Sequence, residues 1–84
     1  MKCLLIGLGN FGSTLAIELT EHGHDVIGVD ILEQRIDEIK DHISVAYIMD
    51  ATQRSALKQL PLDEIDCAIV AIGQSMGNSL RTVA

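Results

Sequence analysis

A glycine-rich segment near the start of the chain has the spacing of a phosphate-binding turn. Gly7, Gly9 and Gly12 form the pattern G-x-G-x-x-G, directly after a short apolar run. Gly7 would allow the tight turn, Gly9 would let a pyrophosphate approach the backbone, and Gly12 would let helix and strand pack closely. The alternative is an ordinary glycine-rich turn. In its strand-to-helix context the pattern predicts a nucleotide site whose contacts come from Gly7, Leu8, Gly9, Asn10, Phe11 and Gly12.

An acidic residue follows at the distance expected for sugar recognition. Asp30 closes the next apolar run, 18 positions after Gly12, where a carboxylate would accept hydrogen bonds from an adenosine ribose. The alternative is a helix-capping or surface aspartate. Asp30 would repel a 2′-phosphate, and no arginine follows it immediately, since Ile31 and Leu32 come next. We therefore expect Asp30 and Ile31 to line a site that prefers NAD(H) or an adenine nucleotide to NADP(H).

Two further segments would lie beside the same ligand. Asp50, Ala51 and Thr52 follow the third apolar run, where an adenine ring would lie, and Asp50 could accept from its amino group. The pattern fits an N-cap equally well, because Gln53 three residues later would complete a capping box. The spacing does not choose between these roles. The fourth run would border the ligand on its other side, at Ala71, Ile72 and Gly73.

Outside these segments the residues do not suggest catalysis or metal binding. Ser13 and Ser55 have no histidine close in the sequence, and the carboxylates fall mainly on expected helix faces. The three histidines and two cysteines lack the spacing of metal ligands. Cys3 and Cys67 each begin an apolar run, which fits buried small hydrophobes or, alternatively, a disulfide or redox pair. We expect no catalytic residue and no metal.

The elements that must position these residues alternate along the chain. Apolar runs predict strands over residues 2–7, 25–30, 44–49 and 66–72. Helical spacing predicts helices over 11–22, 33–42, 52–60 and from 75 onward. In the first helix, Phe11, Leu15 and Leu19 recur every four residues, with Ala16 beside them, and predict the buried face, whereas Ile17 falls outside it.

Strands that alternate with helices predict an α/β fold with a parallel sheet and helices on both of its faces. Right-handed crossovers then give the strand order 3-2-1-4, the first half of a Rossmann-like doubly wound sheet. We expect residues 1–84 to form the N-terminal part of a single nucleotide-binding domain, cut off in its fourth helix.

Composition and charge restrict the partners. A hydrophobic fraction of 48 % excludes a disordered chain, and the apolar runs are far shorter than the roughly 20 residues that cross a bilayer. Twelve acidic residues against six scattered basic ones give a net charge of −6, which would repel a nucleic-acid backbone. We therefore expect no nucleic-acid partner and no direct membrane insertion.

Taken together, the motifs resemble the N-terminal nucleotide-binding domain of the TrkA/KtrA type, the RCK or KTN domain of potassium transport. The resemblance covers essentially the whole chain and rests on Gly7-Leu-Gly-Asn-Phe-Gly12, Val29-Asp30, Met49-Asp-Ala-Thr52 and Asp66-Cys-Ala-Ile-Val-Ala-Ile-Gly73. Dehydrogenases share the glycine pattern, so the Asp-Ala-Thr segment and the last strand discriminate best.

The resemblance implies a regulatory protein, not an enzyme, that binds NAD(H) or ADP/ATP and gates a membrane partner. That partner would be a potassium transporter or channel subunit, with this protein cytoplasmic and peripheral to the inner membrane. Full-length relatives of this type form dimers and octameric rings. The resemblance assigns ribose recognition to Asp30 and adenine recognition to Asp50 with the Ala51 and Thr52 backbone.

Two residues depart from the family pattern. Met49 stands where the family usually has glycine, and Asn10 stands where many ATP/ADP-gated members have an arginine that holds terminal phosphates. The second departure favours NAD(H) or ADP over selective ATP sensing. Two other functions stay open, the cofactor-binding half of an NAD-dependent dehydrogenase and a nucleotide sensor of another cation transporter. The sequence that follows Ala84 would distinguish them.

Overall fold

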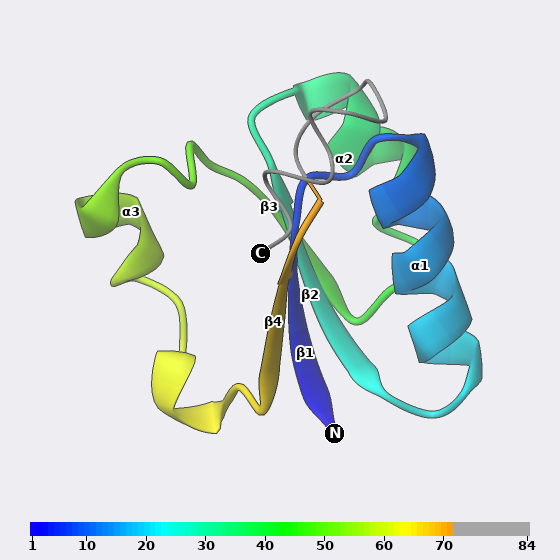
Figure 1. The fold of residues 1–84 in the computed structure, drawn as a ribbon. Helices are drawn as coiled ribbons and strands as arrows, with labels where there is room; N and C mark the ends of the chain where they lie inside the picture. Colours follow the sequence, from blue (N-terminus) through cyan, green and yellow to red (C-terminus); the bar gives the residue numbers. More distant parts are fainter. Residues whose placement is uncertain (72–84) are drawn as a thin grey trace.

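The computed structural model describes residues 1–71 of the chain. In that part, four parallel strands form one sheet in the order β3-β2-β1-β4 (Figure 1). The strands are β1 (Lys2–Ile6), β2 (Asp25–Asp30), β3 (Val45–Ile48) and β4 (Cys67–Val70). The helices are α1 (Asn10–Glu21), α2 (Glu33–Ile39) and α3 (Arg54–Leu57), with a 3₁₀ turn η1 at Leu62–Glu64. The predicted Rossmann-like α/β half-fold and its strand order are confirmed.

The core lies on both faces of the sheet, because side chains alternate along each strand. Leu5 belongs to a cluster beneath α1 and α2, together with Leu8, Ala16, Val26, Ile36, Ile39 and Ile43. Its neighbour Leu4 points to the opposite face, where Ile27, Val29 and Leu60 complete a second cluster. Figure 1 shows α1 and α2 on one side of the sheet and α3 on the other. Helices therefore cover both faces, as predicted.

Strand β1 is one of the two inner strands of this sheet and pairs with β2 on one side and with β4 on the other. Cys3 lies opposite Val26 of β2 and opposite Cys67 of β4. Close to the carboxyl end of the strand, Ile6 lies opposite Val29 and Val70. The glycine turn therefore leaves the middle of the sheet, between the two strands whose ends border the expected ligand.

The element boundaries differ from the predicted ones mainly at helix ends. Helix α2 ends at Ile39, three residues earlier than expected, and α3 contains only Arg54–Leu57. After α3 the chain continues with shorter-range bonds, in which Gln59 N–H donates to the Ala56 carbonyl and Leu60 N–H to the Leu57 carbonyl. This turn buries Leu60 without extending the helix. The predicted helix from residue 75 lies outside the described residues.

The buried face of α1 differs from the predicted one. Phe11 is 65 % exposed, whereas Ala16 is fully buried, and Leu15, Leu19 and Ile17 pack against the cluster below. At about 100° per residue, Leu15 and Ile17 flank Ala16 on its two sides, and Phe11 lies about 140° away from it. The expectations for Phe11 and Ile17 were therefore wrong: the face is centred on Ala16, not on the Phe-Leu-Leu spacing.

Candidate functional site

A cleft of about 250 Å³ opens where the chain leaves the carboxyl ends of the strands. It brings together predicted residues from four separate segments: Gly7, Asp30, Ile31, Asp50, Ala51, Thr52 and Ala71. Four residues that the sequence analysis did not assign complete the wall: Ile6, Val29, Arg35 and Met49. The wall is therefore mostly apolar, with carboxylates at the ends of β2 and β3.

The glycine turn has the geometry that its pattern predicts. Gly7 has a φ of 98°, a left-handed conformation that favours glycine, and its N–H donates to the Val29 carbonyl at 2.9 Å. A Cβ at Gly12 would overlap the Gly7 carbonyl oxygen. Glycine at position 12 therefore lets α1 begin directly against the end of β1.

Other residues of the glycine turn lie away from this cleft. Leu8, Gly9 and Asn10 line a second cavity of about 270 Å³, which also contacts Ser13 and Arg35. Phe11 and Gly12 line neither of these two cavities. Of the six predicted loop residues, the first cleft therefore includes Gly7 alone.

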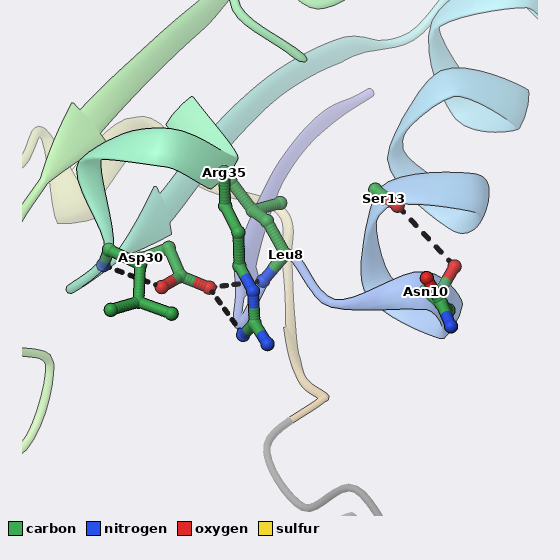
Figure 2. A network of polar contacts seen from close by, with 6 residues as sticks. Leu8, Asn10, Ser13, Asp30 and Arg35 are labelled. Carbon is green, nitrogen blue, oxygen red and sulfur yellow. Dashed lines mark hydrogen bonds and ion pairs between the residues drawn. The ribbon is translucent and has the colours of Figure 1, made fainter. Parts of the chain in front are cut away.

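Asp30 connects the glycine turn to the turn after β2 (Figure 2). Its Oδ2 accepts the Leu8 N–H at 2.8 Å, and its Oδ1 accepts the Leu32 N–H at 2.8 Å. The Arg35 Nη1 lies 3.3 Å from Oδ2 and forms an ion pair with it. Asp30 is 6 % exposed, so this carboxylate is buried, and both of its oxygens accept hydrogen bonds. The alternative of a surface aspartate is wrong.

These contacts keep Asp30 ionised. Burial by itself raises the pKa of Asp30, because it disfavours the charged form. The N–H groups of Leu8 and Leu32 and the guanidinium of Arg35 act in the opposite direction and outweigh burial, so the pKa of Asp30 is lowered. The site therefore presents a carboxylate at neutral pH.

Arg35 was missed by the sequence reasoning. No arginine follows Asp30 directly, but α2 begins at Glu33 and its first turn brings Arg35 back to the carboxylate. A helix start predicted so close to Asp30 is the signal that could have revealed this contact. Arg35 lines both cavities and so stands between them. The preference for NAD(H) over NADP(H) stays a prediction, although an arginine that is not adjacent in the sequence, Arg35, contacts Asp30 in the fold.

Asp50 stabilises its own turn and does not cap a helix. Its Oδ1 accepts the Thr52 N–H at 3.0 Å and the Thr52 hydroxyl at 2.6 Å. These two bonds lower the pKa of Asp50, with the hydroxyl contributing most. Helix α3 begins at Arg54 after Gln53, which makes no side-chain cap. The capping-box alternative is therefore wrong, and the role of Asp50 toward a ligand stays a prediction.

The last predicted segment is described only in part. Ala71 lines the cleft, and its N–H donates to the Ile6 carbonyl at 2.7 Å. Ile72 and Gly73 lie outside the described residues. Within residues 1–71, no three His, Cys, Asp or Glu side chains are grouped as metal ligands. None of the helices described there has the length and apolar character needed to span a membrane.

Comparisons with known proteins give the same family that the motifs resemble. Residues 3–84 match the family described as the TrkA-N domain. The chain is 41 % identical over 78 residues to Ktr system potassium uptake protein C of Bacillus subtilis, covering 93 % of this chain and 35 % of that protein. It is 36 % identical over 76 residues to Ktr system potassium uptake protein A of Vibrio alginolyticus, covering 90 % of this chain and 34 % of that protein. The chain thus spans about a third of the length of these relatives.

A shorter match concerns a dehydrogenase. The chain is 52 % identical over 40 residues to UDP-N-acetyl-D-mannosamine dehydrogenase of Methanococcus vannielii. That match covers 48 % of this chain and 9 % of the dehydrogenase. The similarity is therefore confined to part of the fold, whereas the match to the potassium uptake proteins extends over nearly all of it.

Proposed function

This chain belongs to the TrkA-N domain family, and from that membership we propose that it is the nucleotide-binding part of a regulatory protein of a potassium uptake or channel system. The observation that carries the proposal is the cleft at the strand ends, with a buried, ionised Asp30 beside the glycine turn. The potassium uptake proteins among its relatives support the transport system. Its role would be regulatory, not catalytic.

The cleft fits an adenosine ligand, NAD(H) or ADP/ATP, by its chemistry. The apolar wall from Val29, Met49 and Ala51 suits a flat base, and the carboxylates at its two ends suit groups that donate hydrogen bonds. Asp30 would accept from the ribose hydroxyls and Asp50 from the adenine amino group. The phosphates would extend toward the backbone N–H groups of the glycine turn, where the start of α1 favours negative charge.

The ribose would have to share Asp30 with Arg35. A carboxylate oxygen accepts about two hydrogen bonds, and Oδ2 already receives Leu8 and Arg35. Oδ1 receives the Leu32 N–H and keeps room for one more donor. A single hydroxyl would therefore bind at Oδ1, whereas a diol that uses both oxygens would displace Arg35.

We propose regulation by a shift of populations. Nucleotide in the cleft would favour one arrangement of paired domains over another, and a cytoplasmic ring of such domains at the inner membrane would transmit the change to the pore. A ligand moves such an equilibrium only as far as its affinities for the two states differ. NAD(H), ADP and ATP have their adenosine part in common, so each would bind in the same cleft. Differences between their effects on transport would then arise at the phosphate end.

Calorimetric titration of NADH, NAD, ADP and ATP into the full-length protein tests the ligand. We expect binding by at least one of them, and Asp30→Ala should weaken it about 5- to 150-fold, because a buried hydroxyl loses its acceptor. Asp63→Ala is the matched control, since Asp63 is exposed in η1. Asp30→Asn is a second variant, which removes the charge but keeps the shape of the side chain. It distinguishes weaker binding that follows from loss of the carboxylate from weaker binding that follows from loss of the fold.

Two results would contradict the proposal. If none of the four nucleotides binds, the cleft is not a nucleotide site. If they bind but leave potassium flux through the reconstituted transport system unchanged, the regulatory role is wrong while the site remains. A flux response for a different cation would instead indicate a nucleotide sensor of another transporter.

The dehydrogenase match favours a second candidate, the cofactor-binding half of an NAD-dependent dehydrogenase. Oxidation of a nucleotide-sugar substrate by the full-length protein, followed by NADH absorbance, tests this candidate. We expect no turnover, because the longer matches are to potassium uptake proteins. Steady production of NADH would replace the regulatory proposal with the enzymatic one.

A further inference from the structure

The Arg35 side chain reaches both of the cavities described above. In the cleft at the strand ends it lies beside Asp30. In the second cavity it shares the wall with Gly9 and Asn10 of the glycine turn. Its guanidinium bonds the same Asp30 oxygen as the Leu8 N–H, which places it close to the backbone of that turn (Figure 2). Arg35 therefore stands between the expected positions of the ribose and of the phosphates.

Arg35 also carries the one positive charge that faces these two cavities within residues 1–71. The charged residues that share their walls are all acidic, namely Asp30, Asp50 and Glu38. Phosphate groups brought among these carboxylates would be repelled unless a cation met them, and the net charge of −6 adds to the repulsion. Arg35 is thus the described side chain that is placed to neutralise a phosphate.

The contact between Arg35 and Asp30 can open when a ligand replaces it. Nη1 lies 3.3 Å from Oδ2, and the Arg35 side chain is 30 % exposed, whereas that of Asp30 is 4 % exposed. A partly exposed ion pair contributes only modest net stability, and ribose hydroxyls would supply the hydrogen bond that Oδ2 loses. Within residues 1–71, Nη1 makes the only side-chain hydrogen bond of Arg35. Its other N–H groups are therefore available to a new acceptor.

We propose that Arg35 is the phosphate-binding side chain of this site and that it turns from Asp30 to the phosphates when a ribose binds. The inference rests on the proposed function, because it takes the ligand of the cleft to be a nucleotide. A guanidinium binds phosphate through two parallel charge-assisted hydrogen bonds, which are stronger than neutral ones. In the free protein the same group occupies Asp30. Arg35 therefore opposes the binding of a nucleoside and favours that of a nucleotide, so it determines specificity.

Calorimetric titration of ADP and of adenosine into the full-length protein and its Arg35→Gln variant separates these two effects. We expect the variant to bind ADP about 10- to 150-fold more weakly, because a hydrogen bond to a charged group is lost. Adenosine carries no phosphate, so the variant should bind it as tightly as the parent does, or more tightly. Arg35→Lys keeps the charge but not the planar fork, and it should recover part of the affinity for ADP.

The matched control is Lys40→Gln, which removes the same charge from the end of α2. Lys40 is exposed, pairs with Asp37 at 3.6 Å and lines neither cavity. This variant should bind ADP and adenosine as the parent does. A general effect of lowering the positive charge of the protein would weaken ADP binding equally in Lys40→Gln and in Arg35→Gln, which would contradict the inference.

A second measurement uses the parent protein alone, so that it does not depend on the folding of a variant. Phenylglyoxal modifies accessible guanidinium groups, and peptide mass analysis follows Arg35 beside Arg54, which is exposed and lines neither cavity. ADP should slow the modification of Arg35 but not that of Arg54. Adenosine should not slow it, because the ribose displaces Arg35 from Asp30 without offering it a phosphate.

Three further results would overturn the inference. Loss of ADP and adenosine affinity by the same factor in Arg35→Gln would mean that Arg35 acts only by supporting Asp30. Unchanged affinity for ADP would mean that Arg35 does not meet the phosphates. Equal protection of Arg35 by adenosine and by ADP would mean that it stays at the ribose. If no nucleotide bound to the parent protein, the proposed function itself would be contradicted instead.

Discussion

Asp30 is the residue on which the candidate site depends most. It receives the Leu8 N–H from the glycine turn and the Leu32 N–H from the turn before α2. Removing the acceptor would leave the buried Leu8 N–H without a partner, at a cost of about 1–3 kcal/mol, and would also release the part-buried Leu32 N–H. The same carboxylate thus holds the two turns together and would accept from the ribose. A substitution of Asp30 should therefore change both nucleotide affinity and the free energy of unfolding.

The variant Arg35→Gln tests whether the charge of Arg35 stabilises the fold, through the pH dependence of the free energy of unfolding. The folded pKa of Asp30 is lowered, so Asp30 stabilises the fold fully above its unfolded pKa of about 3.9. That stabilisation is lost as the pH falls through the lower folded pKa. Without Arg35 the folded pKa rises. We expect the variant to be less stable by about 1 kcal/mol at pH 7, with the difference vanishing in acid.

Urea unfolding of parent and variant between neutral and acidic pH measures this difference. Lys40→Gln is the control, because it removes an exposed ion pair between Lys40 and Asp37 on the same segment. It should produce little change at any pH. If the loss caused by Arg35→Gln were the same at neutral and acidic pH, Arg35 would stabilise the fold through packing and not through charge.

At the scale of the element, α1 illustrates what a sequence pattern can and cannot predict. Its existence and approximate ends follow from the glycine turn and the helical spacing. Its buried face does not, because the face is set by the close approach of Gly12 to Gly7 and by Ala16 against the sheet. The repeat of three large side chains instead predicted that Phe11 is buried, whereas Phe11 is exposed in the first turn.

A pair of substitutions tests the corrected face of α1. Phe11→Ala should change the free energy of unfolding by no more than about 0.5 kcal/mol, as exposed positions do. Ile17→Ala should cost about 1–2 kcal/mol, below the range for fully buried sites because Ile17 is only partly buried. Chemical unfolding of both variants gives the comparison. A larger loss for Phe11→Ala than for Ile17→Ala would restore the face expected from the spacing.

Across the whole molecule, the strand order was predictable and the contacts between elements were less so. Alternating apolar runs and helices determine a parallel sheet, and the handedness of crossovers limits its order. The Asp30–Arg35 pair depends on where α2 begins, and the turn of Asp50 depends on α3 starting at Arg54 and not at Thr52. The two-residue shift at α3 changes side-chain partners while leaving the topology intact, whereas α2 begins at Glu33 as predicted and the Arg35 contact was missed all the same.

The place of β1 between β2 and β4 also determines the order in which the protein can fold. Its pairing with β2 joins Lys2 to Asp25, whereas its pairing with β4 joins Lys2 to Asp66, 64 residues away. Closing the longer loop costs about 1 kcal/mol more chain entropy. The β1-α1-β2 unit should therefore form first, and pulse-labelled hydrogen exchange should find the β2 amides protected before those of β4. Simultaneous protection would contradict this order. During synthesis, β1 would leave the ribosome long before β4, so one of its edges would stay unpaired until β4 follows.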